Sequence, residues 1–177
     1  DNVWTKAVDP DGGGVQQMQV FCFDANGIFI TTVKAKLNHD TPDQGSTVSM
    51  SGTVEVSVPE HAHILQLVGN QNLTFFEEDS YRGMTEIELM SSLEASAGRM
   101  IYWARKTVEE LSSYNSASNP VILLRNQAKI TLSVDASKTD FAQKGWIVVN
   151  SKAFGTVAPY SPEQGGLVAP TVEDPFV

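Results

Sequence analysis

Two histidines, His61 and His63, have the spacing of metal ligands. Residues two apart on a strand point to the same side, so both imidazoles could face one ion beside Glu60. A zinc site needs a third protein ligand, and the only other histidine, His39, lies far away in the sequence. Imidazole pairs at strand ends are usually solvated. The spacing therefore allows a metal-dependent enzyme without favouring one.

The other patterns that could do chemistry are incomplete. The glycine run that ends at Gly14 is followed by no Gly-Lys-Ser/Thr, so it is a flexible turn and not a phosphate loop. Asp9 and Asp11 flank this turn without the remaining ligands of a calcium loop. No serine lies in a Gly-x-Ser-x-Gly elbow. We therefore expect neither enzymatic activity nor a cofactor.

Aromatic side chains offer a second kind of site, because their rings can stack on sugars. Tyr102 and Trp103 are adjacent and are the candidate glycan contacts. Scattered aromatic residues are more often part of the core or lie singly on the surface. A sugar-binding platform is thus an alternative that the sequence leaves open.

The composition indicates a globular protein that is not expected to bind nucleic acid. The chain has 177 residues, of which 41% are hydrophobic, and a formal net charge of −9. This charge argues against nucleic acid and anionic membranes as partners, since both attract Lys/Arg patches. No apolar stretch is long enough to span a bilayer, and no signal sequence is evident at the N-terminus. Cys22, the only cysteine, is expected to be a buried, inert thiol.

Alternating apolar residues predict most of the secondary structure. The pattern is clearest in Pro120–Val134, where the residues of one face are apolar and those of the other polar, with a bulge or bend near Asn126. Asp24–Gly27 is typical of a hairpin turn between strands Val15–Phe23 and Ile28–Leu37. Further strands are expected at Gly52–Val58, Ala62–Val68 and Gly145–Lys152. The dry face of the long strand comprises Ile122, Leu124, Ala128, Ile130, Leu132 and Val134.

One helix interrupts the strands. Met84–Leu93 has Thr85 as a candidate N-cap and Glu88 three residues later, which is the capping-box pattern. Ile87, Met90 and Leu93 are predicted to share its buried face, and residues 98–118 are ambiguous between strand and helix. The fold class expected is mainly β, a β-sandwich with a short inserted helix. Half of the eight prolines lie from Pro159 onward, so we expect a sandwich domain over residues 1–155 and a linker or arm over residues 156–177.

Three segments, in this order, resemble the fimbrillin family, the subunits of the type V pili of Bacteroidales. Met18–Gly27 is similar to the family's opening strand with its Asp-x-x-Gly turn. Val54–Asn70 contains a Val-Pro-Glu turn and Leu-x-Leu-Val-Gly-Asn, and Leu124–Ile130 is similar to the family's Leu-x-Arg-x-x-Ala-Lys-Ile strand. Gly155–Pro159 resembles the stretch after which the family's second domain begins.

This resemblance implies an N-terminal fimbrillin domain, a transthyretin-like or Ig-like β-sandwich of about seven strands. It implies export through the periplasm as a lipoprotein precursor and assembly at the outer membrane. A trypsin-like protease removes the first strand of such subunits, and a neighbouring subunit donates a strand into the opened groove. The product is an adhesive fibre of fimbrial subunits joined head to tail.

The family resemblance also points to individual residues. Cleavage in the family usually follows an arginine, whereas this chain has no arginine before Arg82 and has Lys6-Ala7 near the corresponding position. Lys6 and Ala7 are therefore the candidate processing site. The candidate lining of the groove or the core comprises Met18, Val20, Cys22, Ala128, Ile130, Leu132 and Val134.

The main alternative is a surface module that does not polymerise. Such a tip or anchor component would bind host or bacterial surface glycans or proteins, with Tyr102 and Trp103 as its contacts. The sequence does not distinguish among shaft, tip and anchor roles.

Overall fold

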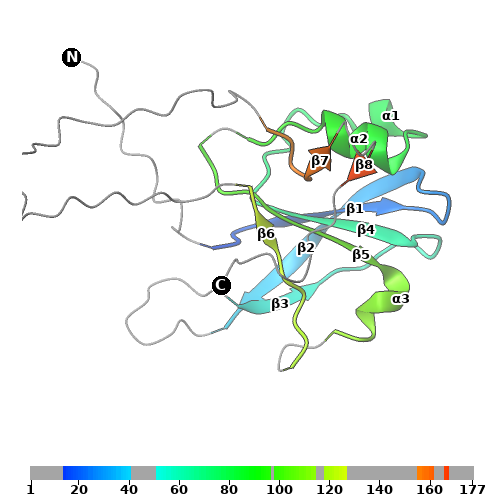
Figure 1. Ribbon diagram of the computed structural model, residues 1–177. Coiled ribbons are helices and arrows are strands. Elements are labelled where there is room, and N and C mark those ends of the chain that lie inside the picture. Colours follow the sequence, from blue (N-terminus) through cyan, green and yellow to red (C-terminus); the bar gives the residue numbers. More distant parts are fainter. Residues whose placement is uncertain are drawn as a thin grey trace, which may run out of the picture.

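One antiparallel sheet of six strands organises the part of the chain that the computed structural model describes (Figure 1). The described residues are 14–40, 51–96, 98–114, 118–126, 155–161 and 166–167. The strand order is β3-β2-β1-β4-β5-β6, and β7 and β8 form a separate hairpin. The strands are β1 (Met18–Phe23), β2 (Phe29–His39), β3 (Gly52–Glu55), β4 (Ile64–Gly69), β5 (Tyr102–Thr107), β6 (Leu124–Arg125), β7 (Tyr160–Ser161) and β8 (Gly166–Leu167).

A tight hairpin joins β1 to β2, as the sequence predicts. The Asp24 carboxylate accepts hydrogen bonds from the backbone N–H groups of Asn26 and Ile28, at 2.8 and 2.9 Å. Gly27 has φ +74°, a conformation that glycine adopts without steric cost. The side chain of Asp24 and the glycine together fix the turn, so β1 and β2 pair in a defined register.

The strand β1 is buried on both faces because each face of the sheet is covered. Met18, Val20 and Cys22 point to one face, where α3 (Val108–Leu111) packs, and Phe21 and Phe23 point to the other. Figure 1 shows α1 (Glu78–Tyr81), α2 (Glu86–Ser92) and the β7–β8 hairpin over this second face, and α3 on the opposite side. The sheet is thus the middle layer of the described structure.

The capping box predicted for the helix is present in α2. The Thr85 hydroxyl accepts from the Glu88 N–H, and the Glu88 carboxylate accepts from the Thr85 N–H. The predicted buried face is wrong in one position, because Ile87 is exposed and Leu89 is buried instead. The seven-residue helix buries only Leu89 and Met90, and the C-cap residue Leu93 continues this narrow stripe, so Ile87 lies outside it.

In the described part of the ambiguous residues 98–118, a strand is followed at once by a helical turn. The strand β5 ends at Thr107, which caps α3 through a second capping box with Glu110. Ser112 and Ser113 donate their hydroxyls to carbonyls of the preceding turn. No helix of the described residues is long and apolar enough to cross a membrane.

A mainly β fold with few, short helices is confirmed, whereas the second sheet of a sandwich stays a prediction. The long strand predicted at Pro120–Val134 is only partly described, and its described part is in strand conformation at Leu124–Arg125. A bend follows at Asn126, as expected. Ile122 is 72% exposed, against its predicted place on the dry face. The other predicted parts of this region, Ala128–Val134 and Gly145–Lys152, lie outside the described residues.

The described residues beyond position 155 pack on the domain, although the sequence suggests a linker there. Val157 and Ala158 are buried in the same cluster as Leu93 and Ile101, and Leu167 packs against it. Two backbone hydrogen bonds fix this segment. The Ala95 N–H donates to the Gly155 carbonyl, and the Val157 N–H donates to the Leu93 carbonyl. The prolines therefore do not mark the edge of the core, because the turn that contains Val157 and Ala158 supplies small apolar side chains to the core.

Candidate functional site

The first strand of the sheet, β1, lies between two long neighbours. It pairs with β2 on one side and with β4 on the other, so both of its hydrogen-bonding edges are used. Met18, Val20 and Cys22 are fully buried beside Ala35 and Leu65. These three residues therefore line the core of the described structure. Their proposed groove partners, Ala128, Ile130, Leu132 and Val134, lie outside the described residues, as do Lys6 and Ala7.

The thiol of Cys22 is expected to be unreactive in the folded protein. Burial, and to a smaller extent the negative charge of Glu78, raises its pKa from an ordinary value of 9.0 to about 11. At pH 8 only about one thiol in a thousand is then a thiolate, the form that attacks alkylating reagents. We expect maleimide to label the native protein at least 100-fold more slowly than the chain unfolded in urea. Equal rates, followed by mass spectrometry, would contradict this assignment.

Asn70 fastens the beginning of the chain's described part to the end of β4. Its side-chain oxygen accepts from the N–H groups of Gln16 and Gln17, at 2.7 and 3.4 Å. Its side-chain amide donates to the carbonyls of Gly14 and Met100, at 2.9 and 3.0 Å. Asn70 has φ +64°, and no other described non-glycine residue has a positive φ. A short polar side chain that bonds locally tolerates this conformation better than most.

The sheet has two outer strands that are much shorter than their neighbours. The strand β6 pairs with β5 only at Tyr102 and Trp103, so residues 104–107 have no β6 partner within the described ranges. On the opposite side, β3 pairs with β2 only over residues 36–39, although β2 begins at Phe29. The strands β2 and β5 therefore each have a stretch whose outer edge is not paired with a described strand.

A glutamate covers part of the uncovered edge of β2. The Glu78 carboxylate, at the start of α1, accepts hydrogen bonds from the Thr31 hydroxyl, the Thr32 N–H and the Thr32 hydroxyl. Burial raises the pKa of Glu78, but these bonds and the charge of Arg82 outweigh it, so the pKa lies below its ordinary value. The carboxylate is thus charged at neutral pH, and it accepts a hydrogen bond from the Thr32 N–H, which an added strand would otherwise use.

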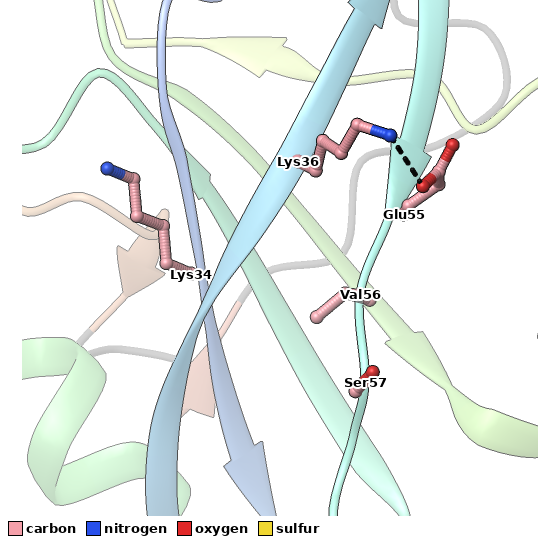
Figure 2. A pocket seen from close by; sticks show the side chains of 5 residues that line it. All are labelled: Lys34, Lys36, Glu55, Val56 and Ser57. Atoms are coloured by element: carbon pink, nitrogen blue, oxygen red, sulfur yellow. Dashed lines mark hydrogen bonds and ion pairs between the residues drawn. The ribbon is translucent and has the colours of Figure 1, made fainter.

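A polar recess of about 380 Å³ lies along the same edge. Figure 2 shows Lys36 of β2 reaching across to Glu55 of β3, with Val56 and Ser57 following on the segment that leaves β3. The ion pair spans 3.1 Å between exposed side chains, so it contributes little to stability. The recess contains no nucleophile with an adjacent base and does not suggest catalysis.

A buried polar network ties α2 to the sheet. The Trp103 indole N–H donates to the side-chain oxygen of Gln66, which is fully buried. The Gln66 amide donates to the Glu86 carboxylate, and Arg105 donates two hydrogen bonds to that carboxylate, at 2.6 and 3.0 Å. Hydrogen bonding to Glu86 raises the pKa of Arg105 above its ordinary value, so the guanidinium stays charged. The network satisfies each polar group that the packing removes from water.

This network accounts for the two residues predicted to contact glycans. Tyr102 and Trp103 are only 7% and 3% exposed, and the Trp103 N–H is already paired inside the domain. A ring covered to this extent offers no face to a sugar. Residue types alone predict an exposed aromatic pair, whereas strand position and a buried partner on β4 determine where the rings lie.

The histidines do not come together with other ligands. His61 and His63 are exposed and flank the buried Ala62 in the turn before β4. No group of three His, Cys, Asp or Glu residues within the described ranges is arranged to hold a metal ion.

Comparisons of the chain with protein-family models, with curated proteins and with solved structures find no match. The resemblance to the fimbrillin family thus rests on the sequence segments alone. In the structure the described parts of these segments form β1 with its turn, the stretch from β3 to the end of β4, and β6.

Three further residues shape this site, and their signals in the sequence differ: Gln66, Asn70 and Glu78. A glutamine inside an apolar strand is a sequence signal of a buried hydrogen bond, since such a group is costly to bury alone. Asparagine after Gly69 at the end of a strand is a signal of a positive φ. Glu78 has no comparable signal, because its partners on β2 lie far away in the sequence.

Proposed function

We propose that this protein is a structural subunit of a cell-surface fimbria that accepts a strand from a neighbouring subunit. The observation that carries the proposal is the outer edge of β5, where residues 104–107 lack a β6 partner within the described ranges. An uncovered strand edge is a template for an added strand. The order of the sequence motifs along the chain supports the same conclusion.

An incoming antiparallel strand would pair with this edge through the backbone. The backbone groups of the edge would supply main-chain hydrogen bonds, which give affinity regardless of the donor's sequence. Ala104, the first residue of this edge, is buried, whereas Arg105 is exposed and Lys106 and Thr107 are half-buried. Side chains of an added strand alternate between its two faces, so the fit of those that face the core would determine which subunit binds.

The Asn70 contacts explain how the subunit could lose its first residues without losing β1. Asn70 holds the backbone at Gly14, Gln16 and Gln17, ahead of the first residue of β1. A cut between Lys6 and Ala7 lies upstream of these contacts. Trimming there would therefore release the N-terminal residues and leave the central strand in register.

Limited digestion with a lysine-specific protease tests this proposal. Trimming of the precursor after Lys6 should convert a monomer into oligomers that resist heating in detergent, measured by size exclusion with light scattering and by gel electrophoresis. The Lys6→Gln variant is the matched control and should form no heat-resistant oligomers under the same treatment. A trimmed protein that stays monomeric at high concentration contradicts the polymerising role.

A further inference from the structure

Phe75 is the most exposed large hydrophobic residue in the described part of the chain. Its side chain is 91% exposed, whereas its neighbours Leu73 and Phe76 pack against the core. A single exposed apolar side chain is common on protein surfaces, but aromatic side chains are enriched at the centres of interfaces. Phe75 is therefore a candidate anchor whose role depends on its surroundings and on a complementary site.

The turn that carries Phe75 is held on both sides. The Asn72 side-chain oxygen accepts from the N–H and the hydroxyl of Thr74, and the Phe76 N–H donates to the Leu73 carbonyl. The Phe76 ring stacks on Tyr81, with centroids 4.4 Å apart, and meets Phe21 edge-on at 5.4 Å. Phe75 thus projects from a backbone that is already ordered, which lowers the entropic cost of binding.

Acidic residues follow Phe75 in the sequence. Glu77 and Asp79 are exposed immediately beyond it, and Arg82 pairs with both Asp79 and Glu78. Three carboxylates against one guanidinium leave the area negatively charged. A complementary site needs an apolar recess of phenyl size with a cation at its rim.

Such a recess lies elsewhere on the same chain, between β6 and the turn at residues 156–159. Its apolar lining includes Leu124, Val157 and Pro159, and Arg125 also lines it. Its volume is about 310 Å³. A cavity of about 150 Å³ already holds benzene, so the recess has room for a phenylalanine ring.

We propose that Phe75 of one copy of this protein inserts into the recess beside Arg125 of a second copy, with Glu77 and Asp79 next to that arginine. The two surfaces are different, so the contact is heterologous and can repeat from copy to copy. A single aromatic anchor buries about 150–250 Å², far below a standard interface, so the contact is weak, with a dissociation constant on the order of 0.1–1 mM. Copies held together in an array would bind more strongly through avidity.

The contact needs neither trimming nor a donated strand, so its test is separate from that of the proposed function. Sedimentation velocity of the untrimmed Lys6→Gln chain, from about 10 μM to 1 mM, should show a rising average mass. The Phe75→Ser variant should stay monomeric, and it should fold normally because Phe75 contributes almost no buried surface. Val54→Ser, which removes an exposed apolar side chain from β3, is the matched control and should associate like the parent.

A mixing experiment tests the two surfaces independently. Arg125→Glu places a carboxylate against Glu77 and Asp79 and should weaken association at least tenfold, with far-UV circular dichroism confirming the fold. Phe75→Ser retains the recess with Arg125, and Arg125→Glu retains Phe75 with Glu77 and Asp79, so a mixture of the two variants should form a one-to-one complex that neither variant forms alone. Adding Glu77→Lys to the Arg125→Glu chain restores an opposite pair and should recover association. A parent chain that is monomeric at 1 mM, or a Phe75→Ser chain that associates like the parent, overturns the proposal, as does a failed charge rescue.

Discussion

Replacing Gln66 by leucine is expected to lower the free energy of unfolding by about 2–4 kcal/mol, although the two side chains are similar in size. The substitution leaves the Trp103 indole N–H without its acceptor in a fully buried position. It also removes a hydrogen bond from the Glu86 carboxylate. Urea denaturation followed by tryptophan fluorescence measures the loss.

A double-mutant cycle separates the hydrogen bond from general packing effects. Trp103→Phe removes the donor, so the combined Gln66→Leu/Trp103→Phe variant has no orphaned N–H. Its loss of stability should be smaller than the sum of the two single losses by about 1–2 kcal/mol, because contacting residues are not additive. Additive losses would show that the bond between Gln66 and Trp103 is not the cause.

Local sequence patterns predicted those parts of the fold that local contacts determine. The turn from Asp24 to Gly27 is fixed by the carboxylate of Asp24 and by the glycine, and both are readable in the sequence. The capping box of Thr85 and Glu88 is equally local. The two apolar faces of β1 follow from its alternation and require only that both sides of the sheet be covered.

Long-range packing determined the rest. The buried stripe of α2 depends on how the short helix lies on the sheet, so periodicity alone placed Ile87 on the wrong side. Tyr102 and Trp103 follow a loop in the sequence, but pairing with β4 draws them into the core. Proline content indicated a linker after residue 155, whereas Val157 and Ala158 fill the end of the core. None of these outcomes is encoded within a few residues of the position concerned.

Asn70→Ala is expected to destabilise the protein by about 2–3 kcal/mol, the second large effect. Alanine loses the four side-chain hydrogen bonds to the stretch before β1 and to Met100, and it carries the steric cost of φ +64°. Urea unfolding measures the total. Amide hydrogen exchange locates it, since Gln16 and Gln17 should lose protection before the central strands do.

Asn70→Gly is the matched variant that separates backbone strain from hydrogen bonding. Glycine adopts a positive φ freely, so it should recover about 1 kcal/mol of the alanine loss while still lacking all four bonds. If glycine is as harmful as alanine, the cost is entirely in the lost contacts. If glycine restores the parent stability, the hydrogen bonds do not hold the chain, and β1 must be kept in register by its pairing with β2 and β4 alone. If glycine recovers only part of the alanine loss, or none of it, the hydrogen bonds of Asn70 anchor the entry into β1 independently of the residues upstream. A subunit trimmed at Lys6 requires such an anchor.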